Sequence, residues 1–387
     1  MNLFTIALVL AAGLAGPLLA APKRARLPVV VGEIVVGVLV GRTGLQWVDP
    51  TEPVLSFLAS AGFALVMLVA GSHVPLRDPA LRVALRRGAL LAAGVGVLAV
   101  PTGFGVAAIT GTGHGLLYAV LLASSSAALI MPVISEYELS TPAALATIVH
   151  VAIADTVCII ALPLAEDPGN AGRSALGVLA VTGGGAVFWF VLWQLRKRGL
   201  VGKAHEVSKN RNFGLELRVA LIAVFGLAGL AQLVGVSVML AGFVIGLGLA
   251  ATGEPRRLAR QLFAVADGFL GPVFFVWLGA SLDLRALAGD PRMLGLATLL
   301  AIASISVHAM ARLLGQPLPL AILAGAQLGV PVAAVAIGTG TRLLTPAEGG
   351  AILAAALVSV GVTAWAARRA AARNVVNCPN SQPDNHH

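Results

Sequence analysis

The chain has 387 residues, of which 58% are apolar and only 11% are charged, and its mean hydropathy is +0.92. Soluble globular domains carry about 25% charged residues. This composition therefore excludes a soluble protein and predicts an all-α membrane protein that crosses the bilayer many times. The net charge of +9 does not indicate a nucleic-acid partner, because most basic residues fall in short loops between apolar segments, where they set orientation.

Apolar runs long enough to cross a bilayer, about 17–25 residues, place thirteen predicted spans along the chain. They are 2–21, 27–41, 54–73, 86–109, 115–134, 142–164, 174–195, 214–233, 236–251, 262–280, 292–314, 317–341 and 347–371. We predict one transmembrane domain over residues 1–372 and a disordered cytoplasmic tail over residues 373–387. The first span has the small-residue end of a signal peptide, but its basic cluster follows it, so we predict a retained span.

The loops between these spans predict the orientation of the protein. With the N-terminus outside, loops on the cytoplasmic side hold 19 Lys and Arg residues, and loops on the outer side hold 5. Cytoplasmic loops of membrane proteins are enriched in these residues. We therefore predict a multi-pass protein whose N-terminus lies outside and whose C-terminus is cytoplasmic.

One carboxylate stands alone in the middle of the sixth predicted span. Asp155 has at least eight uncharged residues on either side, and a charge at the bilayer centre costs between ~2.5 and ~17 kcal/mol, depending on the reference. Three hydroxyl residues, Ser124, Ser125 and Ser126, interrupt the preceding span, and Thr156 directly follows the carboxylate.

Hydroxyls and a lone acid at mid-membrane depth predict a cation or proton site formed by Asp155, Ser125, Ser126 and Thr156. Two alternatives stay open for these residues. The alternative for Asp155 is a buried acid that is hydrogen-bonded within the helix bundle without any transport. The serine hydroxyls are equally explained as donors to the carbonyls of their own helix.

Five segments, in order along the chain, resemble the monovalent cation:proton antiporter superfamily, specifically its bacterial second branch. They are PVVVGEIVVGVLVG, FALVMLVAG, SSSAALIMPVISE, GLELRVALIAVFGLAGLAQLVGVSVMLAGFVIGLGLA and FLGPVFFVWLGASLDLRAL. Each motif alone has low specificity, but five in the same order are strong together. The resemblance spans roughly residues 27 to 370.

This resemblance implies thirteen helices arranged as inverted repeats, with a transport domain that moves against a dimerising scaffold, and hence a homodimer in a bacterial cytoplasmic membrane. The repeats would be spans four to six and eleven to thirteen, and each would contain one broken helix. Discontinuous helices expose backbone carbonyls and helix ends at the midplane, where these groups bind ions. The candidate break points run from Ser124 to Ala127 and from Gln327 through Gly329 to Pro331.

The sequence departs from the family pattern at three places. The residue before Asp155 is Ala154, where relatives carry an acid or an amide, and this favours electroneutral exchange. The position opposite the carboxylate in the eleventh span falls near Ala303 or Ser304 and is not basic. This leaves His308 as a candidate partner, and the alternative for His308 is a buried imidazole bonded to a neighbouring residue. The break in the twelfth span reads GVPVA, without the charges found in relatives.

These observations predict a secondary active transporter that exchanges protons for Na⁺, K⁺ or a similar monovalent cation such as Li⁺ through the single carboxylate. The alternative is a relative that does not exchange ions and acts as a channel-like or regulatory membrane subunit. We predict no enzymatic activity, because the sequence contains no HExxH, CxxC or serine-nucleophile pattern. We also predict no cofactor and no bound metal, and membrane lipid as the surroundings of the protein.

Overall fold

Helices form all the regular structure in the part of the chain that the computed structural model describes, residues 3–21, 29–72, 79–136, 139, 141–166, 168–199, 214–252 and 256–377. They are α1 (Leu3–Gly13), α2 (Ala15–Ala20), α3 (Val29–Val40), α4 (Pro53–Ser72), α5 (Pro79–Thr110), α6 (Gly115–Ala123), α7 (Ala127–Glu136), α8 (Pro142–Glu166), η1 (Pro168–Asn170), α9 (Ala171–Lys197), α11 (Leu215–Leu233), α12 (Val238–Thr252), α13 (Arg256–Val265), the π-helical turn η2 (Ala266–Leu270), α14 (Gly271–Ser281), α15 (Leu284–Ala288), α16 (Pro291–Ala309), η3 (Met310–Leu314), α17 (Leu318–Leu323), α18 (Gly329–Gly340) and α19 (Pro346–Asn377).

Eight helices in the described residues are long and apolar enough to cross a membrane, and shorter apolar helices of 10–17 residues accompany them. The predicted all-helical, polytopic architecture is confirmed. The count of thirteen spans is not, because several apolar runs do not form one continuous helix. The run at 115–134 is divided between α6 and α7, and the run at 317–341 is divided between α17 and α18.

The C-terminal helix extends past the expected domain boundary at residue 372. Helix α19 continues to Asn377, in keeping with the high helix propensity of the Ala and Arg residues around that boundary. The rest of the predicted tail, residues 378–387, lies outside the described residues.

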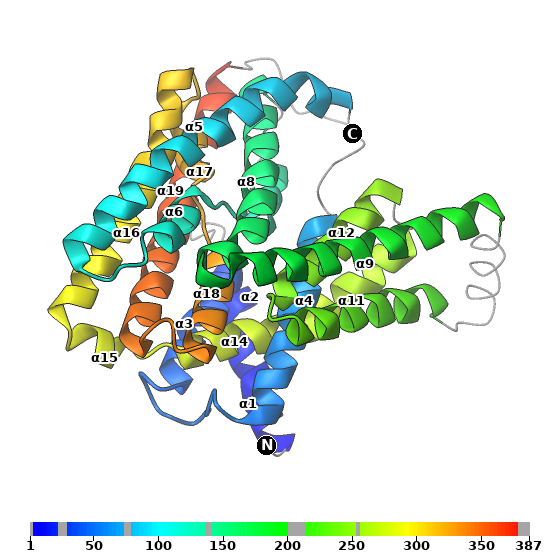
Figure 1. Cartoon of the computed structure of the whole chain (residues 1–387), viewed down its shortest axis with the longest axis horizontal. Helices are drawn as coiled ribbons and strands as arrows, with labels where there is room; N and C mark the ends of the chain where they lie inside the picture. Colours follow the sequence, from blue (N-terminus) through cyan, green and yellow to red (C-terminus); the bar gives the residue numbers. More distant parts are fainter. Residues whose placement is uncertain are drawn as a thin grey trace, which may run out of the picture.

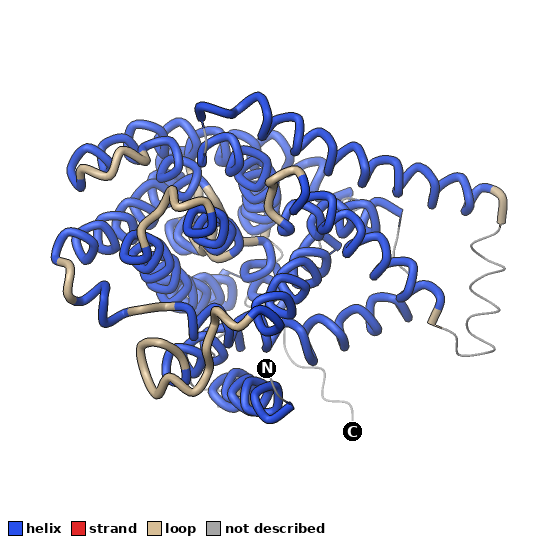
Figure 2. The backbone as a smooth tube through the Cα atoms, turned by 60° about the horizontal axis from the view of Figure 1, so that its bottom comes forward, coloured by secondary structure: helices blue, strands red, loops and turns tan. Residues whose placement is uncertain are grey.

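Two sets of helices are visible in Figure 1. Helices α5, α6, α8, α16, α17 and α19 pack against one another, and α9 and α11 extend away from them at the right of the view. Figure 2 shows the same two long helices projecting from the bundle. Within the first set, a long helix, a broken helix and a long helix occur twice, as α5, α6/α7 and α8 and again as α16, α17/α18 and α19.

Glycines bring the backbones of several helices into direct contact. On α12, Gly242 and Gly246 face backbone carbonyls of α4, and on α3, Gly37 faces α14 at Val276 and Gly279. Small residues allow this approach, which replaces the hydrophobic driving force that is missing between helices in lipid.

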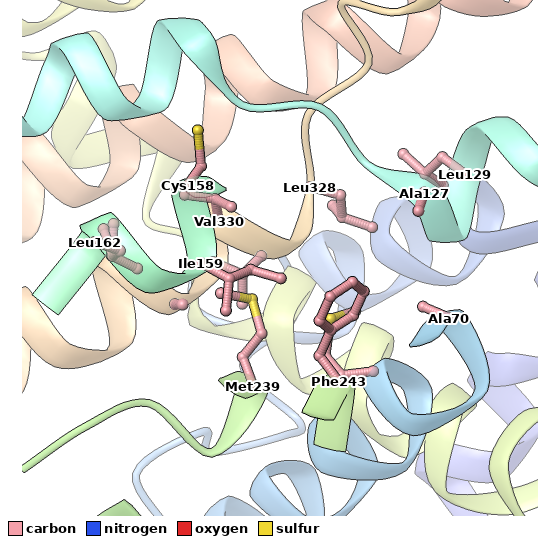
Figure 3. Packing of buried hydrophobic residues seen from close by; sticks show 14 of the residues in the cluster. Ala70, Ala127, Leu129, Cys158, Ile159, Leu162, Met239, Phe243, Leu328 and Val330 are labelled. Carbon is pink, nitrogen blue, oxygen red and sulfur yellow. The ribbon is translucent and has the colours of Figure 1, made fainter. Parts of the chain in front are cut away.

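The apolar core continues up to the two broken helices. Figure 3 shows Ile159 of α8 beside Met239 of α12 and Val330 of α18, with Leu162 of α8 and Phe243 of α12 on either side of them. All five side chains are buried. The broken segments are therefore enclosed in tightly packed apolar surroundings, where an unpaired polar group is costly.

We expect Gly242→Ala to lower the melting temperature of the purified protein in detergent. A methyl group at this position would collide with the backbone carbonyl of Ala64, and overpacking of this kind costs about 1–3 kcal/mol. The matched control is Gly226→Ala on α11, where nothing lies within 4 Å of the added Cβ. Equal melting temperatures for the two variants would contradict the close approach of α4 and α12.

Candidate functional site

The first break lies between α6 and α7 and consists of the three serines. The backbone at Ser124 is extended, with φ −72° and ψ 152°, and residues 124–126 are outside the helices on either side. All three serines are buried. Ser124 Oγ donates to the carbonyl of Leu121 at 2.7 Å, and the carbonyl of Ser126 accepts the amide of Ile130 at 3.0 Å at the start of α7.

The second break lies between α17 and α18, over residues 324–328. It includes Gln327, as expected, but it ends before Gly329, where α18 begins. Gly329 and Pro331 therefore belong to the first turn of α18 and not to the break. The missing amide hydrogen of a proline is no loss in a first turn, where amides lack helix partners.

Side-chain contacts join the two breaks to each other. Ser125 Oγ donates to the carbonyl of Ala324 at 2.7 Å, and Gln327 Nε2 donates to the carbonyl of Ser124 at 3.3 Å. The amide of Gln327 donates to Ser359 Oγ on α19 at 3.1 Å. Two non-helical segments that are about 200 residues apart in sequence therefore cross in direct contact.

Asp155 lies at this crossing. It is 4% exposed on α8, and its Oδ2 accepts the amide of Ala127 at 3.0 Å. Ala127 is the first residue of α7, so the carboxylate lies at the N-terminus of a half-helix, where free amides and the helix dipole favour a negative charge. This is the arrangement by which discontinuous helices form ion sites in transporters.

The structure brings only some of the predicted site residues together. Ser125 and Ser126 lie in the break whose next residue bonds Asp155. Thr156 does not join them through any hydrogen bond of the described residues, because its hydroxyl donates to the carbonyl of Ala152 within α8 at 2.7 Å. The neighbouring position points about 100° away from Asp155 around the helix axis, which explains this outcome.

His308 makes its described contacts with groups other than Asp155. Its ring stacks on the ring of His150 with centroids 5.9 Å apart, and its Nδ1 lies 3.0 Å from the carbonyl of Ser304. The ring also lies against the second break, since a Cβ on Gly325 would be 3.3 Å from it.

Two buried polar residues that the sequence did not single out form hydrogen bonds at the crossing, Ser359 to the second break and Gln316 to α8. His150, which the sequence predicts to be a packing or pathway-lining residue, is buried as well. Their signal is the one that revealed Asp155, a polar residue in an otherwise apolar segment. The sequence gives no means of telling which of these polar residues meet.

A second polar cluster lies at the start of α6 and α19. Glu348 Oε1 lies 2.6 Å from His114 Nδ1 and accepts the hydroxyl of Tyr118 at 2.5 Å. This cluster ties the first turn of α19 to the first turn of α6. Among the described residues, no three His, Cys, Asp or Glu side chains lie close enough together to hold a metal ion.

A crossing of two broken helices around a buried carboxylate is an ion-transporter geometry, and comparison with known proteins identifies its family. The sequence model described as sodium/hydrogen exchanger, transmembrane, matches residues 6–369. The chain belongs to the sodium/hydrogen exchanger family. Its relatives are transporters, and the antiporter, cation:proton exchange character of the family agrees with the predicted resemblance.

Individual relatives are distant. The chain is 24% identical over 294 residues to the Na⁺/H⁺ antiporter of Enterococcus hirae, which covers 72% of this chain and 73% of that protein. It is 29% identical over 305 residues to the glutathione-regulated potassium-efflux system protein KefC of Salmonella typhimurium, which covers 74% of this chain. The chain spans about half the length of KefC and of another relative, YjbQ of Bacillus subtilis.

A solved structure has the same fold as this exchanger-family chain. It is the sodium proton antiporter MjNhaP1 from Methanocaldococcus jannaschii, with a TM-score of 0.67 and 17% sequence identity, covering 96% of this chain and 98% of that chain. The predicted antiporter-like fold is therefore confirmed over nearly the whole sequence.

We expect Ser125→Ala to destabilise the crossing and Thr156→Val to leave it unchanged. The first change removes the donor to the carbonyl of Ala324 in a buried segment, and an unsatisfied buried group costs about 1–3 kcal/mol. The second removes only a bond to a helix carbonyl of α8 itself.

Melting temperatures of the two variants in detergent, each against the unsubstituted protein, check this expectation. A larger drop for Thr156→Val than for Ser125→Ala would mean that the contact between the breaks is not the one that stabilises this region.

Proposed function

We propose that the protein exchanges protons for a monovalent cation, Na⁺ or K⁺, and that Asp155 alternately holds one or the other. The single observation that carries this proposal is the hydrogen bond from the first amide of α7 to the buried carboxylate of Asp155. A lone acid that is 4% exposed in an apolar bundle is costly to ionise. The end of α7 offsets part of that cost without neutralising the charge, so a proton and a cation can compete for the same oxygens.

The groups around Asp155 supply the oxygens that a small cation needs. Hard monovalent cations prefer carboxylate, hydroxyl and carbonyl oxygens. The hydroxyls of Ser125 and Ser126 and the carbonyls freed by the two breaks are the candidate donors. Because Ala154 stands beside Asp155, one carboxylate would carry one proton or one cation, and this favours electroneutral exchange.

The proposal includes a location and an orientation. The excess of Lys and Arg in alternate loops, 19 against 5, supports an N-terminus outside and a C-terminus in the cytoplasm. The bacterial relatives support placement in the bacterial cytoplasmic membrane. We further propose a homodimer, as the family resemblance implies.

One observation favours the alternative of a relative that does not exchange ions. The first turn of α18, GVPVA, contains no charged residue, so no side chain of that turn compensates the helix ends that meet at the crossing. A channel-like or regulatory subunit would tolerate this loss. An exchanger must then rely on Asp155 and its nearby oxygens alone.

We expect everted membrane vesicles containing the protein to move protons when Na⁺, K⁺ or Li⁺ is added, as reported by a pH-sensitive dye, and we expect Asp155→Asn to abolish the signal. The amide keeps the size of the side chain but cannot exchange a proton for a cation. The matched control is Asp49→Asn, which changes an exposed loop carboxylate that bonds Thr51.

When the three cations are tested in parallel, the preferred substrate is the cation that gives a signal at the lowest concentration. A folded, membrane-inserted protein that moves no protons with any of the three would overturn exchange and favour the regulatory subunit. An undiminished signal in Asp155→Asn would place the exchange site elsewhere.

A further inference from the structure

A cluster of buried polar side chains lies between the surface and the second break, on the α8 and α16 side of the crossing. Four of its atoms have no hydrogen-bond partner among the described residues: His150 Nε2, His308 Nε2, Ser304 Oγ and Gln316 Oε1. The relative exposures of the four residues lie between 0% and 2%. An unsatisfied buried polar atom costs about 1–3 kcal/mol, so four in one region call for an explanation beyond packing.

Contacts along α8 order these residues from the surface inward. Gly315 and Pro317 are exposed, and Gln316 between them is buried. Gln316 Nε2 donates to Thr147 Oγ1 at 2.7 Å, which positions the amide one turn before His150 on α8. At 1.5 Å of rise per residue, Thr147 is about 12 Å from Asp155 along the helix axis and His150 is about 7.5 Å from it. His150 also lies about 140° from Asp155 around that axis, so any path between them runs through the neighbouring helices and not along one face of α8.

The inner end of the cluster reaches the crossing through His308. Its ring stacks on His150 with centroids 5.9 Å apart and an interplanar angle of 16°, and it lies against the backbone of Gly325 in the second break. The adjacent carbonyl, that of Ala324, accepts Ser125 Oγ from the first break. The two imidazoles therefore lie between the surface turn and the second break, which contacts the first break near Ala127, the residue that bonds Asp155.

The hydrogen bond at Nδ1 fixes the chemistry of His308. A carbonyl oxygen only accepts, so Nδ1 carries the hydrogen that is donated to Ser304, and Nε2 of the neutral ring has a free lone pair. Nε2 can accept a proton from water and release it again from the same nitrogen, which leaves the ring unchanged. Imidazole is the side chain best suited to this task near neutral pH.

We propose that His150 and His308, with Gln316 at the outer end, form a buried relay that carries protons between the turn at Gly315–Pro317 and the carboxylate of Asp155. The relay works with water as the intermediate carrier, since the unpartnered nitrogen, amide and hydroxyl atoms are the groups that hold buried water in proteins. It rests on the proposed exchange at Asp155. It adds the route by which the proton arrives, which on the proposed orientation opens to the cytoplasm.

The packed elements bring few other titratable groups to the imidazoles. Helix α17 carries none, and α6 carries only Tyr118, whose hydroxyl bonds Glu348. Helix α19 has Glu348 and its Arg residues near its two ends, and α8 has, besides His150, Asp155, the buried thiol of Cys158 and its terminal Glu166. From α5, Arg87 reaches the outer end and donates to the carbonyl of Gly315 at 2.7 Å.

Two substitutions remove the relay nitrogens while keeping the packing. His308→Asn retains an amide donor where Nδ1 bonds the carbonyl of Ser304 and removes Nε2. His150→Phe retains a stacked ring and removes both nitrogens. The matched control is Thr298→Val, on the exposed face of α16, where the hydroxyl bonds only its own helix.

Each variant is measured in vesicles in two ways with the cation that is active in the unsubstituted protein. The first is cation-dependent proton movement, and the second is exchange of labelled for unlabelled cation at equal pH on both sides, which needs no proton. We expect both histidine variants to lower proton movement about tenfold or more. Labelled-cation exchange should stay within about twofold of the unsubstituted protein. The rate of proton movement should depend more steeply on pH in both variants. Thr298→Val should change neither measurement.

The outcomes separate the relay from the exchange proposal. Equal losses in both measurements would show that the histidines only support the structure, and unchanged proton movement would show that protons take another route. Either result overturns the relay while exchange at Asp155 stands. An unsubstituted protein that performs neither process overturns both proposals.

Discussion

The bond between the first amide of α7 and the carboxylate of Asp155 is the interaction on which the rest of the crossing depends. A carboxylate in the middle of an apolar helix needs a polar partner, and an intact neighbouring helix has none to offer, because its amides are used internally. Breaking the neighbour at three serines frees an amide at the required depth. The break therefore provides the hydrogen-bond donor that a carboxylate at this position of α8 needs.

Each break creates new backbone groups that must also find partners. The second break supplies hydrogen-bond partners to the first. The carbonyl of Ala324 accepts the hydroxyl of Ser125, and the side-chain amide of Gln327 donates to the carbonyl of Ser124. Figure 3 shows the apolar side chains that border the two breaks, among them Ala127 and Leu328. Polar bonds therefore hold the crossing together from within, while side-chain packing and glycine contacts such as that of Gly242 hold the helices around it.

The sequence predicted the helical class, the family resemblance and the position of Asp155 as a lone carboxylate, because each depends on residue type and hydrophobic length. It did not predict where the second broken helix, α17/α18, resumes. Pro331 suggests a break, but a proline also fits the first turn of a helix. It also assigned Thr156 to the site by adjacency, although its hydroxyl bonds the helix of which it is part. The count of thirteen spans is not confirmed, because hydropathy does not register a break and places one span over two helices such as α6 and α7. The ligand roles of Asp155, Ser125 and Ser126 stay predictions.

The two halves of the core satisfy their breaks in the same way but with different chemistry. Asp155 is the fourteenth residue of α8 and Ser359 the fourteenth of α19, counted from Pro142 and Pro346. Each accepts a backbone amide from the break in its own half, the carboxylate from Ala127 and the hydroxyl from Gln327. A hydroxyl suffices for the bond itself, so the carboxylate in the first half is more than the structural task requires. That surplus charge at one of two equivalent positions supports the proposal that Asp155 exchanges ions.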